Sequence, residues 1–298
     1  MTSRLDRFIK DQQLPKAFST VVEDYYTPLA GWLHQQCIAK NRLRNSPLVA
    51  GINGAQGTGK STLSRVLKII LEENYQWRVA ILSLDDIYLT RAARHTLAQT
   101  VHPLLQTRGV PGTHDTNLGV EIIHQLKHLK AGQSIDLPRF DKARDDRKPT
   151  SEWETFTGPA ELIIFEGWCV GSVPMEADRL TTPVNDLEAQ EDQDGAWRRY
   201  INHQLQTSYR DLFDQLDVLI MLQAPDFDSI HRWRFEQEQK LAALGTATNQ
   251  IMDKQALSRF IQHYERLTLH NLNEMQDRAD VVLMLNDHHD VVRAHYKK

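Results

Sequence analysis

A glycine-rich loop constrains this sequence more than any other feature. The short apolar run at 47–52 is followed by GAQGTGKS (54–61) and then by STLSRVLKIILEE (61–73), which has apolar residues at helical spacing. This order predicts a strand, a loop and a helix. The loop matches GxxxxGK[ST], in which backbone N–H groups and the helix N-terminus bind phosphate groups. We therefore expect a nucleotide site made by Gly54, Ala55, Gln56, Gly57, Thr58, Gly59, Lys60, Ser61 and Thr62.

Two side chains of this loop have predicted tasks beyond the backbone. Lys60 is expected to reach the β- and γ-phosphates of ATP, and Ser61 is expected to ligate Mg²⁺. The loop alone does not fix the reaction, because switch GTPases, transport ATPases and small-molecule kinases share it. No DxxG sequence follows directly after the third apolar run, and no NKxD occurs. These absences favour a kinase over a guanine-specific switch protein.

Further apolar runs predict the rest of the fold. Strands covered on both faces are apolar at nearly every position, as the runs 78–84, 161–167, 217–222 and 279–285 are. Helical stretches are expected at 120–129, 197–213, 227–244 and 254–276. This alternation predicts an α/β protein with three layers around a mostly parallel, doubly wound sheet, whose carboxyl edge binds ligands.

The sequence predicts a short N-terminal extension and one much longer domain. Residues 1–44 have apolar positions at helical spacing, interrupted by Pro15 and Pro28, and predict an N-terminal helical extension. Residues 45–298 contain no linker or repeat, so we expect one kinase domain with insertions. The polar, acidic stretch 176–195 lacks periodicity and is expected to be a surface loop.

Composition excludes several classes of protein. A formal net charge of −4 without a long basic block gives no footprint for nucleic acid. The longest apolar runs are too short to span a bilayer, and the N-terminus lacks an apolar targeting segment, so we expect a cytoplasmic protein with no membrane partner. Cys37 and Cys169 stand in no metal-binding pattern, and His288 and His289 are expected in a solvated loop.

Acidic residues follow two of the predicted strands. Asp85 and Asp86 come directly after the second strand, where a carboxylate can accept the proton of an attacking hydroxyl. Either residue could instead cap a helix. Glu166 ends the third strand, and a carboxylate after buried residues is suited to organising Mg²⁺ together with Ser61.

Six segments in order resemble the P-loop D-glycerate 3-kinases and their fungal kinase-like relatives, within the wider group of uridine, pantothenate and phosphoribulo-kinases. The resemblance covers residues 45–285 and rests on GINGAQGTGKST, SLDDIYLT, RGVPGTHD, LPRFDK, FEGW and WRFEQE. It implies that Asp85 is the general base. Ile87 replaces the usual Phe of that segment and Asp86 adds a second acid, so the division of labour between Asp85 and Asp86 stays open.

The same resemblance places RGVPGTHD at the acceptor. It implies that His114 and Asp115 bind hydroxyls, and the full predicted acceptor set is Asp86, Tyr88, Arg108, His114, Asp115 and Arg139. Independently, a carboxylate on the acceptor requires a cation. Candidates for that cation are Arg108, Arg139, Lys142, Arg144 and Arg147, of which Arg139 is favoured and Arg144 is better explained as part of a solvated face.

The segment SIHRWRFEQE opens the helix after the fourth strand. Arg232 and Arg234 are placed to cover the transferring phosphoryl group as part of a helical lid, although an ordinary amphipathic helix would show the same pattern. The sequence thus predicts a Mg²⁺- and ATP-dependent kinase that phosphorylates a primary hydroxyl of a small metabolite, with D-glycerate as the leading acceptor. The alternatives are a pantothenate- or uridine-kinase-like acceptor and a regulatory ATPase that is not a kinase.

Overall fold

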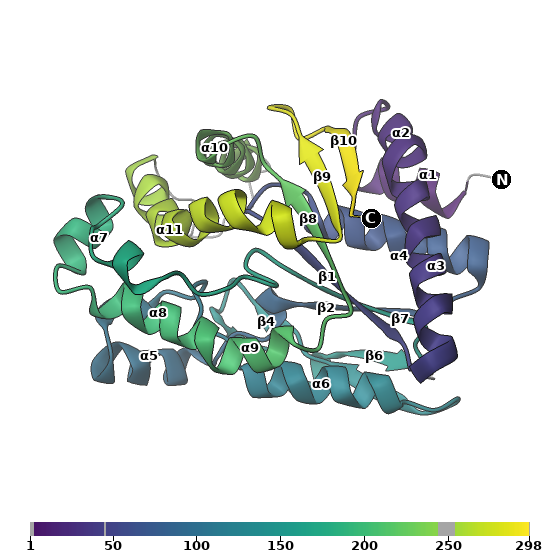
Figure 1. The fold of residues 1–298 in the computed structure, drawn as a ribbon, viewed down its shortest axis with the longest axis horizontal. Helices are drawn as coiled ribbons and strands as arrows, with labels where there is room; N and C mark the ends of the chain where they lie inside the picture. Colours follow the sequence, from purple (N-terminus) through teal and green to yellow (C-terminus); the bar gives the residue numbers. More distant parts are fainter. Residues whose placement is uncertain (1–2, 45, 244–253, 298) are drawn as a thin grey trace.

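A computed structural model describes residues 3–44, 46–243 and 254–297. Within these ranges the central sheet has six strands: β1 (Leu48–Gly54), β2 (Val79–Ser83), β7 (Leu162–Gly167), β8 (Val218–Gln223), β9 (Val281–Leu285) and β10 (Val291–Tyr296). Their order is β10-β9-β8-β1-β7-β2. The first five in chain order are parallel and β10 is antiparallel to β9 (Figure 1).

Helices cover both faces of this sheet. They are α1 (Arg4–Asp11), α2 (Phe18–Val21), α3 (Thr27–Arg44), α4 (Lys60–Tyr75), α5 (Arg91–Thr100), α6 (Thr116–His128), α7 (Asp186–Glu191), α8 (Ala196–Gln206), α9 (Ser208–Phe213), α10 (Phe227–Ala243) and α11 (Lys254–Arg278). A π-helical turn, η1 (Val22–Tyr26), joins α2 to α3. Single 3₁₀ turns are η2 (Leu84–Asp86), η3 (Pro103–Gln106), η4 (Thr150–Glu152) and η5 (Ala177–Leu180).

Two small antiparallel hairpin sheets lie between α6 and β7. One pairs β3 (Ser134–Leu137) with β6 (Glu154–Thr157), and the other pairs β4 (Phe140–Asp141) with β5 (Asp146–Arg147). Phe140 is buried, so its ring anchors the second hairpin in the fold while the turn that follows β4 stays near the surface.

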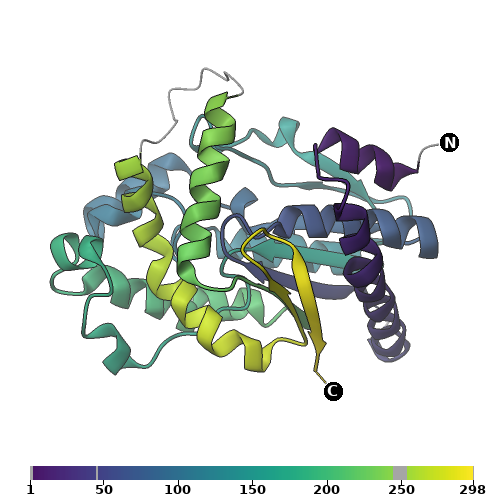
Figure 2. The same ribbon diagram turned by 90° about the horizontal axis from the view of Figure 1, so that it is seen from above.

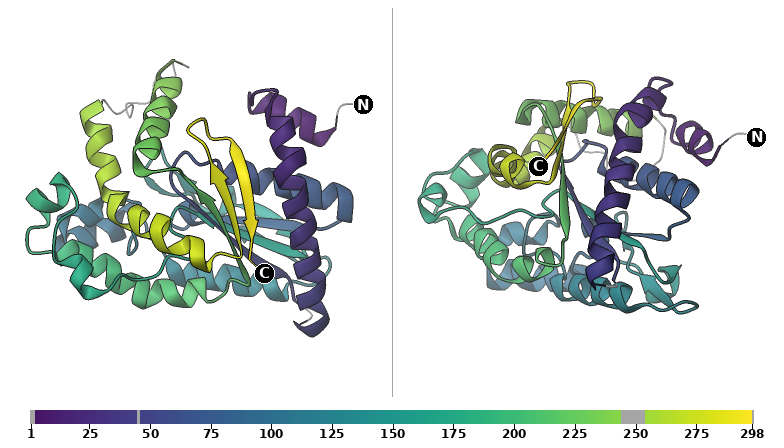
Figure 3. Two further views of the ribbon diagram at one scale, coloured as in Figure 1. Left: turned by 45° about the horizontal axis from the view of Figure 1, so that its top comes forward. Right: turned by 45° about the vertical axis from the view of Figure 1, so that its right-hand side comes forward.

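Side chains that alternate between the two faces of a strand build one hydrophobic core on each side of the sheet. In β1, Leu48, Ala50 and Ile52 belong to a core shared with α3 and α4, whereas Val49 belongs to a core shared with α6, α8 and α9. Successive side chains of a strand point to opposite faces, so one apolar strand supplies both cores. Figures 1 and 3 show the two helical layers on either side of the sheet, and Figure 2 shows α10 and α11 side by side.

The predicted strands are confirmed as β1, β2, β7, β8 and β9, and so is the α/β class with its mostly parallel sheet. Helices α6, α10 and α11 overlap predicted stretches, with α6 starting four residues earlier and α11 ending two residues later than predicted. Residue 244, the predicted end of one stretch, is outside the described residues. The helical stretch predicted at 197–213 is confirmed, although Thr207 (φ −118°, ψ −103°) divides it into α8 and α9. Helix α5 and strand β10 were not predicted.

The N-terminal helices share a core with the sheet. Leu29 and Leu33 of α3 are fully buried in the same cluster as Leu67 and Leu71 of α4. Because α4 begins at the glycine-rich loop, α3 supports the helix that carries that loop. Residue 45, the predicted start of the kinase domain, lies outside the described residues.

The acidic stretch 176–195 is not the simple surface loop that the sequence predicts. It contains η5 and α7, and two of its carboxylates are buried in ion pairs. Glu188 pairs with Arg266 of α11 at 2.5 Å, and Asp192 pairs with Arg198 of α8 at 3.0 Å. The two pairs depend on partners outside this stretch. The acidic composition of residues 176–195 alone therefore wrongly predicted an exposed loop.

Among the helices in the described ranges, none combines the length and apolarity that crossing a bilayer requires.

The buried pair of Asp192 and Arg198 yields a stability prediction. Replacing Arg198 by Met leaves Asp192, which is fully buried, with an uncompensated charge, so the free energy of unfolding should fall by about 3–5 kcal/mol. Urea denaturation measures the loss. The matched control is Arg210→Met, because Arg210 and Asp214 form an exposed pair at 3.8 Å; it should change stability by less than about 0.5 kcal/mol. Equal losses of unfolding free energy in the two variants would contradict the view that the buried pair of Asp192 and Arg198 stabilises the fold.

Candidate active site

A cavity of about 800 Å³ opens at the carboxyl edge of the sheet, where β1, β2 and β7 end. Strands are added on one side of β1 and then on the other, and open α/β sheets bind ligands at such a switch point. The walls come from the glycine-rich loop, the ends of β2 and β7, the two hairpins, α10 and α11. Polar and aromatic side chains in the lining are Gln56, Lys60, Ser61, Arg65, Lys68, Ser83, Asp85, Asp86, Tyr88, Arg108, Arg139, Lys142, Glu154, Phe156, Glu166, Trp168, Arg234, Gln237, Phe260 and Tyr264.

The loop between β1 and α4 depends on glycine. Gly57 and Gly59 have φ values of +85° and +87°, a region that residues with a Cβ rarely adopt. A Cβ on Gly54 would lie 2.6 Å from Thr58 Oγ1, so that position also excludes a side chain. Thr58 closes the turn by donating from Oγ1 to the Ala55 carbonyl oxygen at 2.8 Å. The result is a tight turn that leads straight into a helix N-terminus.

Lys60 is the first residue of α4, and Thr62 lies in the same turn. The first N–H groups of a helix have no partners within the helix, so they are available to an anion at the loop. The Lys60 ammonium donates to the Ala55 carbonyl oxygen at 3.0 Å. Burial lowers the pKa of Lys60, while the nearby carboxylates of Glu166 and Asp85 raise it. The lysine is therefore held inside the cavity between the loop and two acids.

Ser61 and Glu166 meet across the cavity floor. Ser61 Oγ donates to Glu166 Oε1 at 2.9 Å, which joins the start of α4 to the end of β7. Glu166 is 6% exposed. A hydroxyl and a carboxylate are hard oxygen ligands of the kind Mg²⁺ prefers, and this ion usually keeps waters and substrate phosphates as its remaining ligands. In the described ranges there is no cluster of three or more His, Cys, Asp or Glu residues that could hold a metal by themselves.

Asp85 is held by two donors at the end of β2. Tyr88 donates its hydroxyl to Oδ1 at 2.8 Å, and Lys142 donates its ammonium to Oδ2 at 2.6 Å. Burial raises the pKa of Asp85, but Lys142 and Tyr88 outweigh burial and lower it to about 2. Asp85 is thus ionised at neutral pH, on the same side of the cavity as Lys60.

Asp86 has a different environment from its neighbour. Its Oδ1 accepts the backbone N–H of Phe140 at 3.1 Å, and its Oδ2 accepts from Arg139 at 3.3 Å. Burial raises the pKa of Asp86, while Arg139 opposes that effect. Both oxygens therefore tie the β4–β5 hairpin to the end of β2, and Asp86 lines the cavity as an anchor of its wall.

Arg108 and Arg139 lie in the acceptor side of the cavity but have carboxylate partners. Arg108 pairs with Asp145 and lies 5.6 Å from the centre of the Phe140 ring. Arg139 pairs with Glu154 as well as with Asp86. These guanidinium groups are therefore largely occupied in the structure.

The glycine after Arg108 explains part of the RGVPGTHD segment. Gly109 has a φ of +139°, and a Cβ there would collide with the ring of Tyr264 from α11. The Tyr264 hydroxyl donates to the Arg108 carbonyl oxygen at 3.2 Å, and Trp168 Nε1 donates to the Gly109 carbonyl oxygen at 2.8 Å. This close packing fixes the backbone beside the Arg108 side chain.

His114 and Asp115 do not line the cavity, although they are predicted at the acceptor. An antiparallel bridge between Tyr88 and His114 places the two rings in a stack with centroids 4.4 Å apart. His114 Nδ1 meets the Tyr209 hydroxyl, and His114 is buried behind Tyr88. Asp115 caps α6 by accepting the Leu118 N–H at 3.1 Å.

The remaining predicted cations of the hairpin also lie outside the lining. Arg147 donates to Asp115 and to the Tyr88 carbonyl oxygen, each at 3.0 Å. Arg144 is exposed, and its partner is Asp141 at 3.5 Å. Arg147 therefore holds the segment behind Asp85, and Arg144 belongs to the solvated surface, as the sequence indicates.

The two arginines of α10 have different positions. Arg234 lines the cavity, donates to Gln237 Oε1 at 2.9 Å and lies 5.9 Å from the centre of the Phe260 ring. Arg232 is outside the lining and pairs with Asp287 at 2.6 Å. Residues two apart on a helix project roughly 200° from each other, so only one of the pair can face the cavity. Of the two arginines predicted to cover the phosphoryl group, the structure therefore places Arg234 at the cavity and Arg232 outside its lining.

Several residues at the site were missed. Tyr264 and Phe260 occupy positions i and i−4 of a long helix, and their spacing resembles that of ordinary core residues. His289 lies in the turn between β9 and β10, where its Nδ1 meets the Gly57 carbonyl oxygen at 2.9 Å and its ring stacks on Trp233. No local motif marks these contacts, because each joins segments far apart in the chain.

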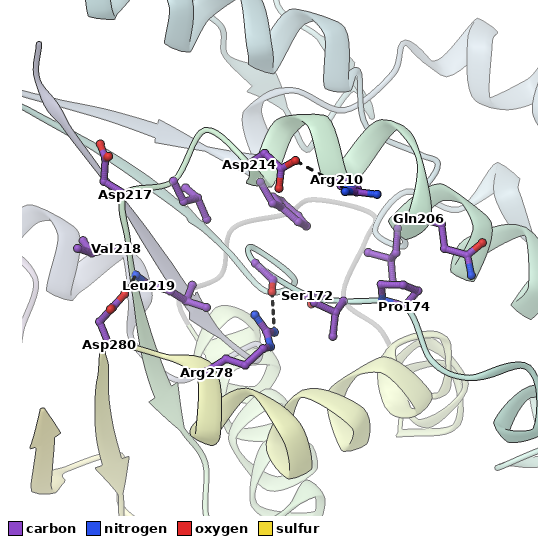
Figure 4. A pocket seen from close by; sticks show the side chains of 15 residues that line it. Ser172, Pro174, Gln206, Arg210, Asp214, Asp217, Val218, Leu219, Arg278 and Asp280 are labelled. Atoms are coloured by element: carbon purple, nitrogen blue, oxygen red, sulfur yellow. Dashed lines mark hydrogen bonds and ion pairs between the residues drawn. The ribbon is translucent and has the colours of Figure 1, made fainter. Parts of the chain in front are cut away.

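A second cavity, of about 520 Å³, lies between α9 and α11 near the amino ends of β8 and β9 (Figure 4). Two of its carboxylates are committed to the sheet, since Asp217 accepts the Val49 N–H at 3.0 Å and Asp280 accepts the Leu219 N–H at 2.7 Å. Its described lining shares no residue with that of the first cavity. The glycine-rich loop therefore identifies the first cavity as the candidate active site.

Comparison with known proteins agrees with this geometry. Residues 49–174 match the model of the Phosphoribulokinase / Uridine kinase family. The chain is 31% identical over 225 residues to the uncharacterized kinase mug58 of Schizosaccharomyces pombe, covering 73% of this chain and 78% of that protein. The chain belongs to the phosphoribulokinase/uridine kinase family. It is therefore an ATP-dependent phosphotransferase, as the loop and the acids after β2 predict.

Two D-glycerate 3-kinases are also similar over most of this chain. The chloroplastic D-glycerate 3-kinase of Arabidopsis thaliana is 30% identical over 253 residues, which are 80% of this chain and 52% of the plant protein, so the chain spans about half of that protein's length. The structure of D-glycerate 3-kinase from Cryptococcus neoformans aligns with a TM-score of 0.75 and 26% identity, covering 92% of this chain and 99% of that one.

The buried His114 gives a prediction about pH and stability. Burial lowers the pKa of His114 from 6.5 to about 3. Between these values the unfolded chain binds a proton that the folded chain excludes, so this residue's contribution to stability is lost as pH falls below 6.5, by up to about 1.4 kcal/mol per pH unit. In His114→Gln this loss should be absent, and urea denaturation at several pH values measures it.

The control for this experiment is His128→Gln, because His128 is exposed on α6. Its dependence of stability on pH should match that of the wild type. Identical slopes for the wild type and His114→Gln between pH 6.5 and 5 would contradict the assignment of His114 as a buried neutral ring.

Proposed function

We propose that this protein is a D-glycerate 3-kinase, which transfers the γ-phosphoryl group of ATP to the primary hydroxyl of D-glycerate. The observation that carries the proposal is the position of Asp85, ionised and facing the same cavity as Lys60 and the Ser61–Glu166 pair. Cationic side chains also line this cavity, as a hydroxy acid requires. The similarity to two D-glycerate 3-kinases supports this choice of acceptor.

The loop residues would bind the triphosphate. The N–H groups at the start of α4 and the Lys60 ammonium would hold the β- and γ-phosphates, and Ser61 and Glu166 would hold Mg²⁺. These residues suit Mg²⁺ because two oxygen ligands, the Ser61 hydroxyl and the Glu166 carboxylate, already lie 2.9 Å apart beside the helix N-terminus. When bound, Mg²⁺ neutralises charge on the phosphate oxygens.

Asp85 would accept the proton of the acceptor hydroxyl. In this reaction the hydroxyl oxygen forms a bond to the γ-phosphorus, the bond to ADP breaks, and the proton passes to the Asp85 carboxylate. Because the transition state of phosphoryl transfer is loose, an ionised carboxylate can take the hydroxyl proton as the new bond develops. Tyr88 keeps Asp85 oriented through the bond to Oδ1.

The test of acceptor identity is a coupled ADP-release assay with a panel of hydroxylated metabolites. D-glycerate should raise the rate of ADP release far above the rate with ATP alone. A greater response to pantothenate or a nucleoside would reassign the acceptor. Indifference to the whole panel would favour a regulatory ATPase and contradict the proposal.

The two adjacent acids provide a matched pair of variants. Asp85→Asn should lower kcat by about 10²–10⁴-fold with little change in the Kd of ATP, because the base is lost and the loop is intact. Asp86→Asn should keep kcat within about tenfold of the wild type, since Asp86 anchors Arg139 and the Phe140 backbone. Steady-state kinetics and nucleotide titration measure these effects. The reverse pattern would make Asp86 the base.

The two arginines of α10 provide another pair. Arg234→Ala should lower kcat by about 10³-fold, because a guanidinium in the cavity can stabilise charge on the transferring group. Arg232→Ala should leave kcat within about threefold, because that side chain pairs with Asp287 outside the cavity. Steady-state kinetics at saturating ATP and acceptor measure both. A greater loss in Arg232→Ala than in Arg234→Ala would contradict the placement.

A further inference from the structure

Lys142 has an unusual position for a surface cation. It follows β4 in the hairpin turn, and Asp141 Oδ1 fixes this turn by accepting the N–H groups of Ala143 and Arg144 at 2.9 and 3.1 Å. The Lys142 side chain is 61% exposed, yet its ammonium donates to Asp85 Oδ2 at 2.6 Å. A largely exposed side chain from a hairpin therefore covers the carboxylate proposed as the base.

The other cations of the acceptor wall are less able to move. Arg139 is fixed by Asp86, Glu154 and the Pro138 carbonyl oxygen. Arg108 is fixed by Asp145 and by its position near the Phe140 ring. Lys142, in contrast, pairs with Asp85 among the described residues. Since lysine carries a compact charge on a flexible stem, Lys142 can exchange one carboxylate for another.

We propose that Lys142 binds the carboxylate of the acceptor, and that it is held on Asp85 until an acceptor with a carboxylate arrives. This inference rests on the proposed function and names the group that selects a hydroxy acid. In a short hydroxy acid the carboxylate and the reacting hydroxyl are close together, so a hydroxyl placed at Asp85 brings the acceptor carboxylate near Lys142. A cation is needed there, because two carboxylates side by side repel each other.

The exchange has a consequence for Asp85. While Lys142 is bound to Asp85 alone, its charge reduces the tendency of the carboxylate to take a proton from water. Sharing Lys142 with the acceptor weakens that effect when the acceptor hydroxyl is in place. The same side chain would therefore select the acceptor and limit ATP hydrolysis in its absence.

The test compares Lys142→Met with Lys148→Met. Lys148 belongs to the same hairpin segment and its partner is Glu152 at 3.5 Å, so the control removes the same charge away from Asp85. Isothermal titration of D-glycerate, with a non-hydrolysable ATP analogue present, should show about 10- to 100-fold weaker binding in Lys142→Met. Binding to Lys148→Met should stay within about twofold of the wild type.

Kinetics separate acceptor binding from a structural role. With D-glycerate, Lys142→Met should raise KM by about 10- to 100-fold with a smaller change in kcat. With glycerol, which has the primary hydroxyl but no carboxylate, kcat/KM should not fall in Lys142→Met, because no acceptor carboxylate depends on this cation and Asp85 is released from its charge. Lys142→Arg should restore part of the D-glycerate affinity. ATP hydrolysis without acceptor should rise in Lys142→Met.

The outcomes distinguish this inference from the function on which it rests. A wild type that phosphorylates D-glycerate, together with unchanged D-glycerate binding in Lys142→Met, would overturn the inference alone. Equal losses with D-glycerate and glycerol would also overturn it, because they would indicate a structural role; Lys142→Gln and a melting curve check that the fold is intact. A wild type that acts on no hydroxy acid would overturn both proposals.

Discussion

The turn from β1 into α4 can be made only by a backbone that enters the left-handed region twice within three residues. Gly57 and Gly59 meet that demand, and the helix that begins at Lys60 then presents its first N–H groups at the carboxyl edge of the sheet. Other parts of the chain are arranged around this turn. Trp233 of α10 packs against Gly57, and His289 from the β9–β10 turn contacts the Gly57 carbonyl oxygen.

The second half of the site consists of acids at the carboxyl ends of two neighbouring strands, β7 and β2. Glu166 faces the helix N-terminus through Ser61, and Asp85 lies between Lys142 and Tyr88. Loop and acids are on different segments, but the parallel sheet brings the carboxyl ends of β1, β2 and β7 to one edge. A phosphate-binding turn beside a base is therefore a direct consequence of strand order. The β4–β5 hairpin then adds the cations of the acceptor wall.

Sequence reasoning succeeded where a local pattern has one physical meaning. The apolar runs of β1 and β7 are buried on both faces, and the glycine spacing of the loop fits a phosphate. It failed where meaning depends on distant partners. In the sequence Glu188 is typical of a solvated acid, but in the structure it pairs with Arg266 of α11.

The same limit applies within the candidate site. The sequence could not tell which of Arg232 and Arg234 faces the cavity, since that depends on the rotation of α10 against α11. His114 was placed near the acceptor, but its bridge to Tyr88 sets it one layer behind. Lys142 was one of several candidate cations, and only the folded hairpin shows that its ammonium reaches Asp85.

The fate of the γ-phosphoryl group tests the central claim most directly. Phosphorus-31 NMR of the protein with ATP, Mg²⁺ and D-glycerate resolves a phosphate monoester from inorganic phosphate. The account predicts that 3-phosphoglycerate appears in step with ADP, and that the signal is lost in Asp85→Asn. Inorganic phosphate forming at the same rate with and without D-glycerate would contradict it.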